Sequence, residues 1–407
     1  MAGAITTRCC IAGGGPAGMM LGFLLARAGI DVVVLEKHKD FLRDFRGDTI
    51  HPSTLELMHE LGLLSEFIKL PHEKAEAVGG RFGNYPVTIA DLRHLPTQCK
   101  FIALMPQWDF LNFLADHGKR YPSFHLHMET EAQELIEKGG RVVGLRALTP
   151  GGPLEIRATL TVGCDGRNST LREKAGFTVE TLGAPMDVLW FRLSRKASDS
   201  QQTGGAFLPG RIFVTLNRGD YWQCAYVIPK GTIDEVYGRG LEAFRAEIAK
   251  AVPDFADRTG EITGWDQVKL LTVAVDRLNR WYKPGLLCIG DAAHAMSPIG
   301  GVGVNLAVQD AVAAANILAE PLRSGAVTDE ALQAVQDRRT FPTRATQRLQ
   351  IFMQNNIISA VLADKGELDP PLVLRMLQWF PILQRIPARL LGLGFRPEHI
   401  HTPERVA

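Results

Sequence analysis

Residues 8–37 read RCCIAGGGPAGMMLGFLLARAGIDVVVLEK, a pattern that predicts a strand, a tight turn, a helix and a second strand. Gly13, Gly15 and Gly18 supply the spacing G-x-G-x-x-G, and Glu36 closes the second strand 23 residues after Gly13. The glycines permit the turn and let backbone N–H groups approach a pyrophosphate, which the helix N-terminus also favours. Glu36 can accept hydrogen bonds from a ribose. The stretch therefore predicts a Rossmann-like dinucleotide-binding unit, without distinguishing NAD from FAD.

The composition is that of an ordinary globular protein. The 407 residues are 46% hydrophobic and 22% charged, so two or three domains are expected. A net charge of +1, without a dense Lys/Arg block, gives no reason to expect nucleic acid. Six scattered cysteines, with no CxxC pair, predict reduced thiols and no metal site. We see no signal peptide and no uninterrupted apolar run long enough to span a bilayer, and we expect a cytoplasmic protein.

A second motif follows a hairpin predicted over residues 141–163. The sequence CDGRNSTLREKAG places Asp165 and Gly166 where a strand ends and a helix begins. An isolated Asp-Gly is usually only a turn. Here it follows an apolar strand and precedes R-x-S-x-x-R, and this combination is more specific than a turn.

A third motif occupies residues 285–318, GLLCIGDAAHAMSPIGGVGVNLAVQDAVAAANIL. A buried strand ends at Asp291, which can hydrogen-bond a polyol hydroxyl. Glycines at 300, 301 and 303 let backbone N–H groups reach a flat heterocycle with no Cβ in the way. The segment therefore predicts room for the ribitol and ring of a flavin, whose adenine end lies on the first loop.

Taken together, GGGPAG (13–18), CDGRNS (164–169) and GDAAHAMSPIGGVGVN (290–305) resemble the class A flavoprotein monooxygenases, the para-hydroxybenzoate hydroxylase-like family. The resemblance covers roughly the first 320 residues, and three motifs in register are more specific than one. It implies an α/β fold, with a Rossmann-like FAD-binding domain, an inserted antiparallel-sheet substrate domain and C-terminal helices. It also implies an enzyme that uses NADPH or NADH and O₂ to hydroxylate an aromatic or other electron-rich small molecule through a flavin C4a-hydroperoxide.

The resemblance further implies a non-covalent FAD and the residues that hold it. Glu36 would bind the adenosine ribose, and Arg46 and Gln107 the ribityl–pyrophosphate region, although many relatives carry arginine at the position of Gln107. Asp165 would support binding of both flavin and reduced nicotinamide, which binds transiently because no second G-x-G-x-x-G occurs. The full expected cofactor set is Gly13, Gly15, Pro16, Ala17, Gly18, Glu36, Lys37, Arg46, Gln107, Asp165, Gly166, Asp291, Gly300, Gly301, Val302, Gly303, Val304 and Asn305. Pro298, inside the third motif, and His51 are the candidates for catalytic roles near the ring.

The segments between the motifs predict the domain layout. We expect residues 1–75, 100–180 and 267–340 to form a discontinuous FAD-binding domain and 341–407 a C-terminal helical region. Residues 76–99 and 181–266 would form the substrate-binding sheet. Periodicity does not decide which side chains of this sheet face the flavin. Candidates for the substrate roof are Trp190, Arg192, Trp222, Gln223 and Tyr226. Ser53 and Glu56 predict a capping box at a helix start.

Several alternatives stay open from the sequence. An FAD-dependent reductase of isoprenoid-type double bonds, or a flavoprotein that binds a ligand without turnover, would carry the same motifs. A flavin halogenase is disfavoured because its W-x-W-x-I-P occurs here only as CAYVIP (224–229). Residues 371–394, PLVLRMLQWFPILQRIPARLLGLG, could pack on the cofactor domain, form a homodimer face or lie on a membrane. Prolines 381 and 387 break this stretch, which favours packing or self-association.

Overall fold

The computed structural model describes residues 3–42, 49–199, 203–363, 366 and 368–405. Its first strand–helix–strand unit is the one that residues 8–37 predict. It consists of β1 (Gly3–Ala12), α1 (Pro16–Arg27) and β2 (Val32–Leu35). β1 pairs in parallel with β2 and with β11 (Gly152–Gly163). Cys9 and Cys10 lie in the hydrophobic clusters on opposite faces of this sheet, and both are buried, free thiols.

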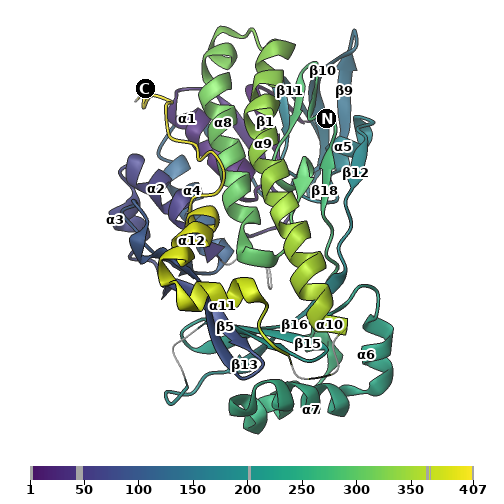
Figure 1. Ribbon diagram of the computed structural model, residues 1–407. Helices are drawn as coiled ribbons and strands as arrows, with labels where there is room; N and C mark the ends of the chain where they lie inside the picture. The colour runs from purple at the N-terminus through teal and green to yellow at the C-terminus, as the bar shows by residue number, and fades with distance from the viewer. Residues whose placement is uncertain (1–2, 43–48, 200–202, 364–365, 367, 406–407) are drawn as a thin grey trace.

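The Rossmann-like sheet is completed by short strands on either side of this unit. Its order is β19 (Tyr282–Lys283), β20 (Leu286–Cys288), β11, β1, β2 and β8 (Phe124–His127). One face packs on α1, α4 (Gln107–Gly118) and α8 (Gly303–Ser324), as Figure 1 shows. On the other side, β9 (Glu131–Lys138) and β10 (Arg141–Thr149) extend β11 as antiparallel strands. The pairing of β10 with β11 confirms the hairpin predicted over 141–163.

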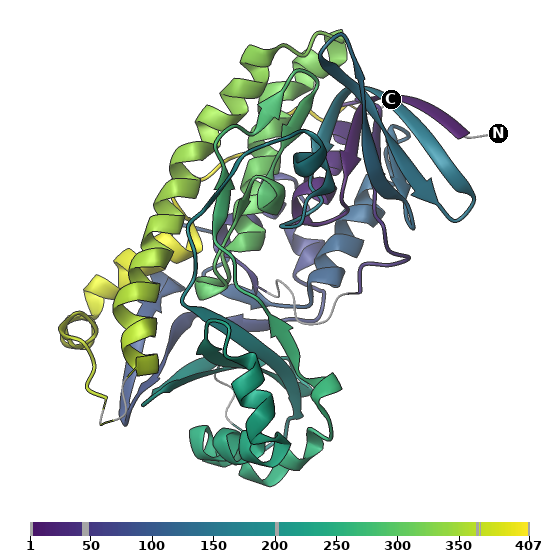
Figure 2. The ribbon, with the colours of Figure 1, turned by 90° about the vertical axis from the view of Figure 1, so that its right-hand side faces the viewer.

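A second, seven-stranded sheet lies below the first in Figures 1 and 2. Its order is β17 (Lys269–Leu271), β13 (Met186–Ser194), β16 (Tyr221–Pro229), β15 (Arg211–Asn217), β14 (Gly204–Leu208), β5 (Ala77–Phe82) and β6 (Tyr85–Asp91). Helix α7 (Leu241–Ala251) covers its outer face, and α6 (Ile233–Arg239) lies beside it. Because β17 pairs with β13, the boundary expected at residue 267 is wrong by one strand.

Helix α9 (Asp329–Met353) connects the two sheets, and Figure 2 shows it running the height of the molecule. It continues through a π-helical turn (Gln354–Ile358) into α10 (Ser359–Ala363). The boundary expected at residue 341 therefore falls inside a helix. Pro342 lies inside α9, and the buried face of the helix continues past it at Thr343, Gln347 and Gln350.

The start of α2 corrects another expectation. α2 spans Pro52–Glu60, with His51 as its N-cap in an extended conformation (φ −83°, ψ 163°) and no side-chain cap. Proline at the first helical position fixes the start there, because its ring pre-sets φ and it lacks the N–H that a cap would satisfy. The predicted capping box is therefore wrong: Ser53 lies inside the first turn, and Glu56 accepts a hydrogen bond from the Gln98 N–H at 3.0 Å.

The remaining described elements are short. Two three-stranded sheets have the orders β12–β18–β21 and β3–β7–β4. Their strands, with the helices not yet given, are β3 (Thr49–Ile50), α3 (Leu64–Phe67), β4 (Glu73–Ala75), β7 (Ile102–Leu104), α5 (Thr170–Lys174), β12 (Val179–Thr181), β18 (Asp276–Leu278), β21 (His294–Ala295), α11 (Leu372–Trp379) and α12 (Arg385–Gly392). One segment, Ile299–Ser324, has the length and composition of a membrane span, but 78% of its most apolar window is buried inside the protein. That burial is typical of a core helix.

Candidate functional site

The glycines in the turn between β1 and α1 have two different roles: some allow close packing within the protein, and one leaves open space. A Cβ on Gly13 would lie 2.3 Å from the Cys164 carbonyl oxygen, and one on Gly18 would lie 1.9 Å from the Gly13 carbonyl oxygen. Both positions therefore need glycine for packing within the protein. A Cβ on Gly15 would have no atom of the described residues within 4 Å. Gly15 is also the N-cap of α1, which has no side-chain cap and has Pro16 in its first turn. The open side of this turn fits a pyrophosphate on the helix N-terminus.

Glu36 lies against this loop from the end of β2. Its Oε2 accepts a hydrogen bond from the Gly14 N–H at 3.2 Å, and its Oε1 accepts one from the His38 N–H at 3.0 Å. The neighbouring Lys37 is exposed. Gln107 occupies the first position of α4. Arg46 lies outside the described residues, so its expected contact with the cofactor phosphates has no structural counterpart here.

The second motif meets the third through a pair that the sequence did not single out. Arg167 Nη2 lies 3.6 Å from Asp291 Oδ2, and both side chains are about one-third exposed (34%). Arg172 donates to the Arg167 carbonyl oxygen and so holds this turn. Arg167 stands inside CDGRNS, next to Gly166, so the motif itself carried the signal. The two residues are 124 positions apart in the sequence, and their contact joins the second motif to the third beside the predicted ribityl site.

Asp165, in contrast, uses its carboxylate within its own loop. It accepts hydrogen bonds from Ser169 Oγ at 2.5 Å and from the Leu171 N–H at 3.1 Å, at the start of α5. Burial raises the pKa of Asp165 above its ordinary value, although these hydrogen bonds oppose the rise. Its side chain therefore shapes the turn that presents Gly166 (φ 85°) and Arg167.

The third motif forms a tight loop ahead of α8. Gly300 and Gly301 have φ values of 76° and 63°, which favour glycine, and a Cβ on Gly301 would lie 2.4 Å from Thr49 Oγ1. Pro298 precedes this turn, and its carbonyl oxygen accepts the Gly301 N–H at 3.0 Å. Val302 is the N-cap of α8, Gly303 and Val304 open its first turn, and no side chain caps it. Its positive end is thus available to an electron-rich ring edge.

Asn305 and His51 pack beneath this loop. Asn305 Oδ1 accepts from the His51 N–H at 2.9 Å and from Thr54 Oγ1 at 2.7 Å, and its Nδ2 donates to the Thr49 carbonyl oxygen at 3.3 Å. The Asn305 amide therefore joins α8 to α2, and only its backbone is left to face a ligand. His51 is fully buried, and its Nδ1 lies 2.8 Å from the Leu391 carbonyl oxygen. Burial lowers the pKa of His51 to about 4, although the Leu391 and Gly300 carbonyls favour the charged form.

A buried charge network supports the turn that carries Asp291. Asp310 Oδ2 accepts the Gly290 N–H at 3.1 Å and lies 2.6 Å from His294 Nε2, while Asp310 Oδ1 accepts from Arg339 Nε at 2.8 Å. Burial opposes ionisation of Asp310, but His294 and Arg339 lower its pKa below the ordinary value. The backbone next to Asp291 is therefore fixed by an ion pair inside the core.

Two glutamines, one on α9 and one on the π-helical turn that follows it, hold the loop from its other side, and sequence reasoning missed them. Gln350 accepts the Ser297 N–H at 3.1 Å and donates to the carbonyl oxygens of Ser297 at 3.0 Å and Ile299 at 2.9 Å. Gln354 donates to Ser297 Oγ at 2.9 Å from the π-helical turn, a deviation that is frequent at functional sites. Their helical spacing was visible in the sequence, but amides on a charged helix are ordinarily assigned to solvent.

The five substrate candidates lie on opposite faces of the seven-stranded sheet. Trp222 and Tyr226 lie with Leu189 and Phe244 in the cluster under α7, on the side away from the 298–301 loop. The expectation that they form the substrate roof is wrong. Trp222 and Gln223 are adjacent on one strand, so their side chains must point to opposite faces.

Trp190, Arg192 and Gln223 share the opposite face. Trp190 pairs across the sheet with Ala225, and Arg192 with Gln223. Trp190 packs on the same apolar cluster as Ile299, and its buried Nε1 has no hydrogen-bond partner among the described residues. Arg192 lies 4.8 Å from the centre of the Tyr221 ring, and Gln223 Oε1 accepts from Arg218 Nε at 2.9 Å. Trp190 is thus the candidate with an unused donor.

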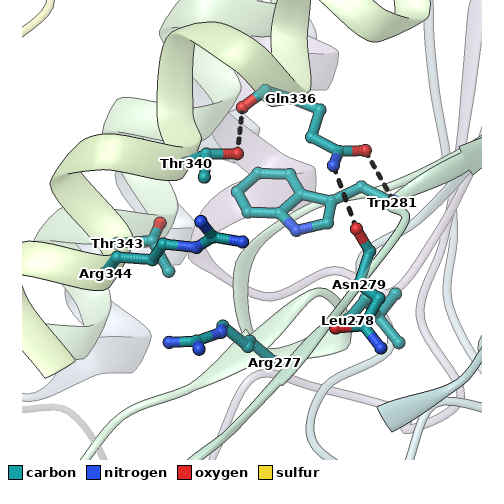
Figure 3. A pocket seen from close by; sticks show the side chains of 8 residues that line it. All are labelled: Arg277, Leu278, Asn279, Trp281, Gln336, Thr340, Thr343 and Arg344. Atoms are coloured by element: carbon teal, nitrogen blue, oxygen red, sulfur yellow. Dashed lines mark hydrogen bonds between the residues drawn. The ribbon is translucent and has the colours of Figure 1, made fainter. Parts of the chain in front are cut away.

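Two cavities in the structure differ in volume. One, of about 10 Å³, lies between β18 and α9 and is shown in Figure 3. There the Gln336 amide bonds the Trp281 N–H and the Asn279 carbonyl oxygen. It has room for about one water molecule, so it is not a site for an aromatic ring. The other, of about 270 Å³, is lined by Phe82, Ile357 and Val361, which belong to the Trp190 cluster.

Among the described residues, no group of three His, Cys, Asp or Glu side chains could hold a metal. The geometry instead fits a dinucleotide with a flavin end. The Glu36 carboxylate suits the adenosine ribose, and the open turn at Gly15 suits the pyrophosphate. The Arg167–Asp291 pair suits the ribityl chain, and the uncapped start of α8 suits the flavin ring. When bound, FAD supplies the redox and oxygen chemistry, and the chain supplies binding and shielding.

Comparison with known proteins agrees with this assignment. The family model described as "FAD binding domain" matches residues 6–349. The chain is 32% identical over 357 residues to 6-methylpretetramide 4-monooxygenase of Streptomyces rimosus, covering 87% of this chain and 85% of that protein. It is 29% identical to rifampicin monooxygenase of Rhodococcus hoagii, over 74% of this chain but only 61% of that protein. The solved structure of PqsL, a probable FAD-dependent monooxygenase from Pseudomonas aeruginosa, has a TM-score of 0.74 at 20% identity, covering 88% of this chain and 98% of that one.

The chain belongs to the FAD-binding-domain family, and within it to the class A flavoprotein monooxygenases. It is an FAD-dependent oxidoreductase that uses reduced nicotinamide and O₂ to hydroxylate an aromatic or other electron-rich small molecule. The comparisons support this reading and not the isoprenoid reductase or the ligand-binding flavoprotein.

Proposed function

We propose that the protein hydroxylates a fused-ring phenolic compound of the aromatic polyketide type, in the cytoplasm. The observation that carries this proposal is Trp190, whose buried indole N–H has no hydrogen-bond partner among the described residues. Trp190 packs on the same apolar cluster as Ile299, the residue after Pro298. A buried donor is costly unless something accepts its hydrogen bond. A phenol or ring carbonyl oxygen is such an acceptor, and the surrounding apolar cluster suits several fused rings. The 32% identity to 6-methylpretetramide 4-monooxygenase supports this substrate class.

The proposed division of labour follows the geometry. The Gly13–Gly18 loop and Glu36 would hold the adenosine and pyrophosphate, and the Arg167–Asp291 pair the ribityl chain. Lys37, Gln107 and the backbone of Asp165 and Gly166 would lie along the cofactor. The residues from Pro298 to Asn305 would face the flavin ring through their backbone, with Pro298 and Ile299 on the substrate side.

We assign His51 a positioning role in place of proton transfer. With a pKa of about 4, its imidazole is neutral at neutral pH. Its Nδ1 then donates to the Leu391 carbonyl oxygen, and its backbone N–H donates to Asn305. His51 therefore ties α12 and α8 to the turn before α2.

The test is NADH or NADPH oxidation in air, followed at 340 nm, with fused-ring phenols, quinolones and simple phenols as candidate substrates. We expect product mass to rise by one oxygen atom with a fused-ring phenol. Trp190→Phe keeps an aromatic side chain but removes the donor, so KM should rise about tenfold for one hydrogen bond, with more H₂O₂ formed per nicotinamide. Trp265→Phe, under α7, is the matched control. Turnover of simple phenols alone, or unchanged kinetics in Trp190→Phe, would overturn the proposal.

A further inference from the structure

The C-terminal helices expose an unusually apolar surface. We call it the C-terminal face and define it as Leu372, Val373, Met376, Trp379, Phe380, Ile382 and Ile386, on α11, α12 and the turn between them. Leu372 is 66% exposed, Trp379 63% and Ile382 65%. Ten of the sixteen exposed large apolar side chains of the described residues lie between positions 341 and 386. Monomeric soluble proteins rarely expose apolar side chains in one such group.

The exposure does not come from a loosely attached helix. On its other side α11 buries Leu374, and Gln378 bonds both the N–H and the carbonyl oxygen of Thr88 on β6, at 3.1 and 2.9 Å. The Gln384 amide donates to the Leu377 carbonyl oxygen at 2.9 Å and joins the turn to α11. Figure 1 shows α11 and α12 side by side at the front of the molecule. One face of this unit is docked, and the other is presented outward.

The charged residues of the segment that forms this face are all basic. Between positions 370 and 397 the sequence has four arginines and no aspartate or glutamate. Arg385 and Arg389 lie one helical turn apart on α12, are exposed, and have no ion-pair partner among the described residues. Arg375 pairs with Asp369 at 3.3 Å, at the edge of the face. Basic residues beside exposed tryptophan, phenylalanine and isoleucine are typical of a surface that lies in a membrane interface.

Charge complementarity separates a lipid surface from a second copy of the chain. In a symmetric dimer through this face each copy would bring Arg385 and Arg389, and the 370–397 segment has no carboxylate to meet them, which is unfavourable. Lipid phosphates supply the missing negative charge. The boundary between headgroups and acyl chains accommodates the aromatic rings of Trp379 and Phe380, which are exposed in the same segment as the arginines.

We propose that the C-terminal face binds the surface of an anionic lipid bilayer. Ile382, Trp379 and Phe380 enter the boundary between headgroups and acyl chains, while Arg385 and Arg389 contact lipid phosphates. The inference goes beyond the hydroxylase activity, and its test needs no turnover. It also departs from the sequence expectation of packing or self-association: Pro381 begins a short 3-10 turn, so the stretch becomes two helices that share one outward face.

The experiment uses the FAD-loaded full chain and vesicles of phosphatidylcholine, alone or with phosphatidylglycerol. We expect co-sedimentation with the anionic vesicles only, weakening as salt is raised. Arg385→Gln with Arg389→Gln should reduce partitioning about 25-fold, since each arginine near the surface contributes about a factor of five. The matched control, Lys138→Gln with Arg146→Gln, removes two exposed charges from the β9–β10 hairpin and should bind as the wild type does.

Trp379 supplies a second, local measurement. Lipids brominated on the acyl chains should quench part of the tryptophan emission, and Trp379→Phe should lose that part while keeping its FAD and its circular dichroism. No binding to anionic vesicles, or equal binding by the arginine variants, would overturn the proposal. A wild-type dimer in sedimentation velocity that Trp379→Ser converts to a monomer would show that a second copy covers the face instead.

Discussion

Replacement of Gln350 by methionine tests whether α9 positions the flavin loop. The change keeps the side-chain volume but removes all three hydrogen bonds to Ser297 and Ile299, whose lengths are 2.9–3.1 Å. Gln350 is only 3% exposed, so water cannot easily replace them. At about 1 kcal/mol of net stabilisation for each bond, the ordered loop loses about 3 kcal/mol. That loss corresponds to a roughly hundredfold smaller equilibrium ratio of ordered to disordered loop.

The consequence for the cofactor follows from population arithmetic. If FAD binds only the ordered loop, its apparent dissociation constant rises as that population falls, by up to about a hundredfold. The measurement is quenching of flavin fluorescence when FAD is titrated into the apoprotein, together with the thermal unfolding midpoint.

Gln347→Met is the matched control for this experiment. Gln347 is equally buried on the same helix, but its amide donates to the carbonyl oxygens of Asp276 and Ala295, outside the 297–301 loop. Both variants should unfold at lower temperature, and only Gln350→Met should lose FAD affinity. Equal affinities in the two variants would refute the reasoning.

Four further predictions follow from single sites. Gly15→Ala should leave the apoprotein's unfolding midpoint unchanged but weaken FAD binding, whereas Gly18→Ala should destabilise the fold, because its Cβ would lie 1.9 Å from a carbonyl oxygen. Asp291→Ala should reduce FAD affinity about ten- to a hundredfold, since a hydrogen bond to a charged group contributes about 1.5–3 kcal/mol; full flavin occupancy after dialysis would contradict the assignment. Asp310→Asn should lower the free energy of unfolding by about 1.5–3 kcal/mol in denaturant titrations, because it removes one of the two carboxylates that pair with the buried Arg339 guanidinium and leaves only Glu398, at 3.1 Å. Between pH 6.5 and 4 the unfolded chain binds a proton at His51 that the folded protein does not, because the folded pKa is about 4 against 6.5. Stability should therefore fall as the pH falls through this window, by up to about 3 kcal/mol, and His51→Asn should flatten the slope.

The sequence by itself determined the local parts of the candidate cofactor site. A glycine turn, a strand-terminal carboxylate and a helix start are set within a few neighbouring residues, so their spacing is visible in one dimension. For that reason Gly13, Gly18 and Glu36 lie where residues 8–37 placed them. The hairpin of β10 and β11 was predictable on the same ground.

Only the tertiary structure decided which side of each element faces the site. Trp190 and Trp222 both stand on strands of one sheet, and the pairing register alone sends them to opposite faces. Gln350 bonds Ser297, a residue 53 positions away in the sequence. The sequence does not show whether the amide of a helical glutamine faces water or a distant loop. The sequence around Trp379 is amphipathic. Trp379 is exposed because the other face of α11, which carries Gln378, is the one that packs on β6. Burial is a property of neighbours that the chain brings together only on folding, because the hydrophobic effect acts on area removed from water and not on order along the chain.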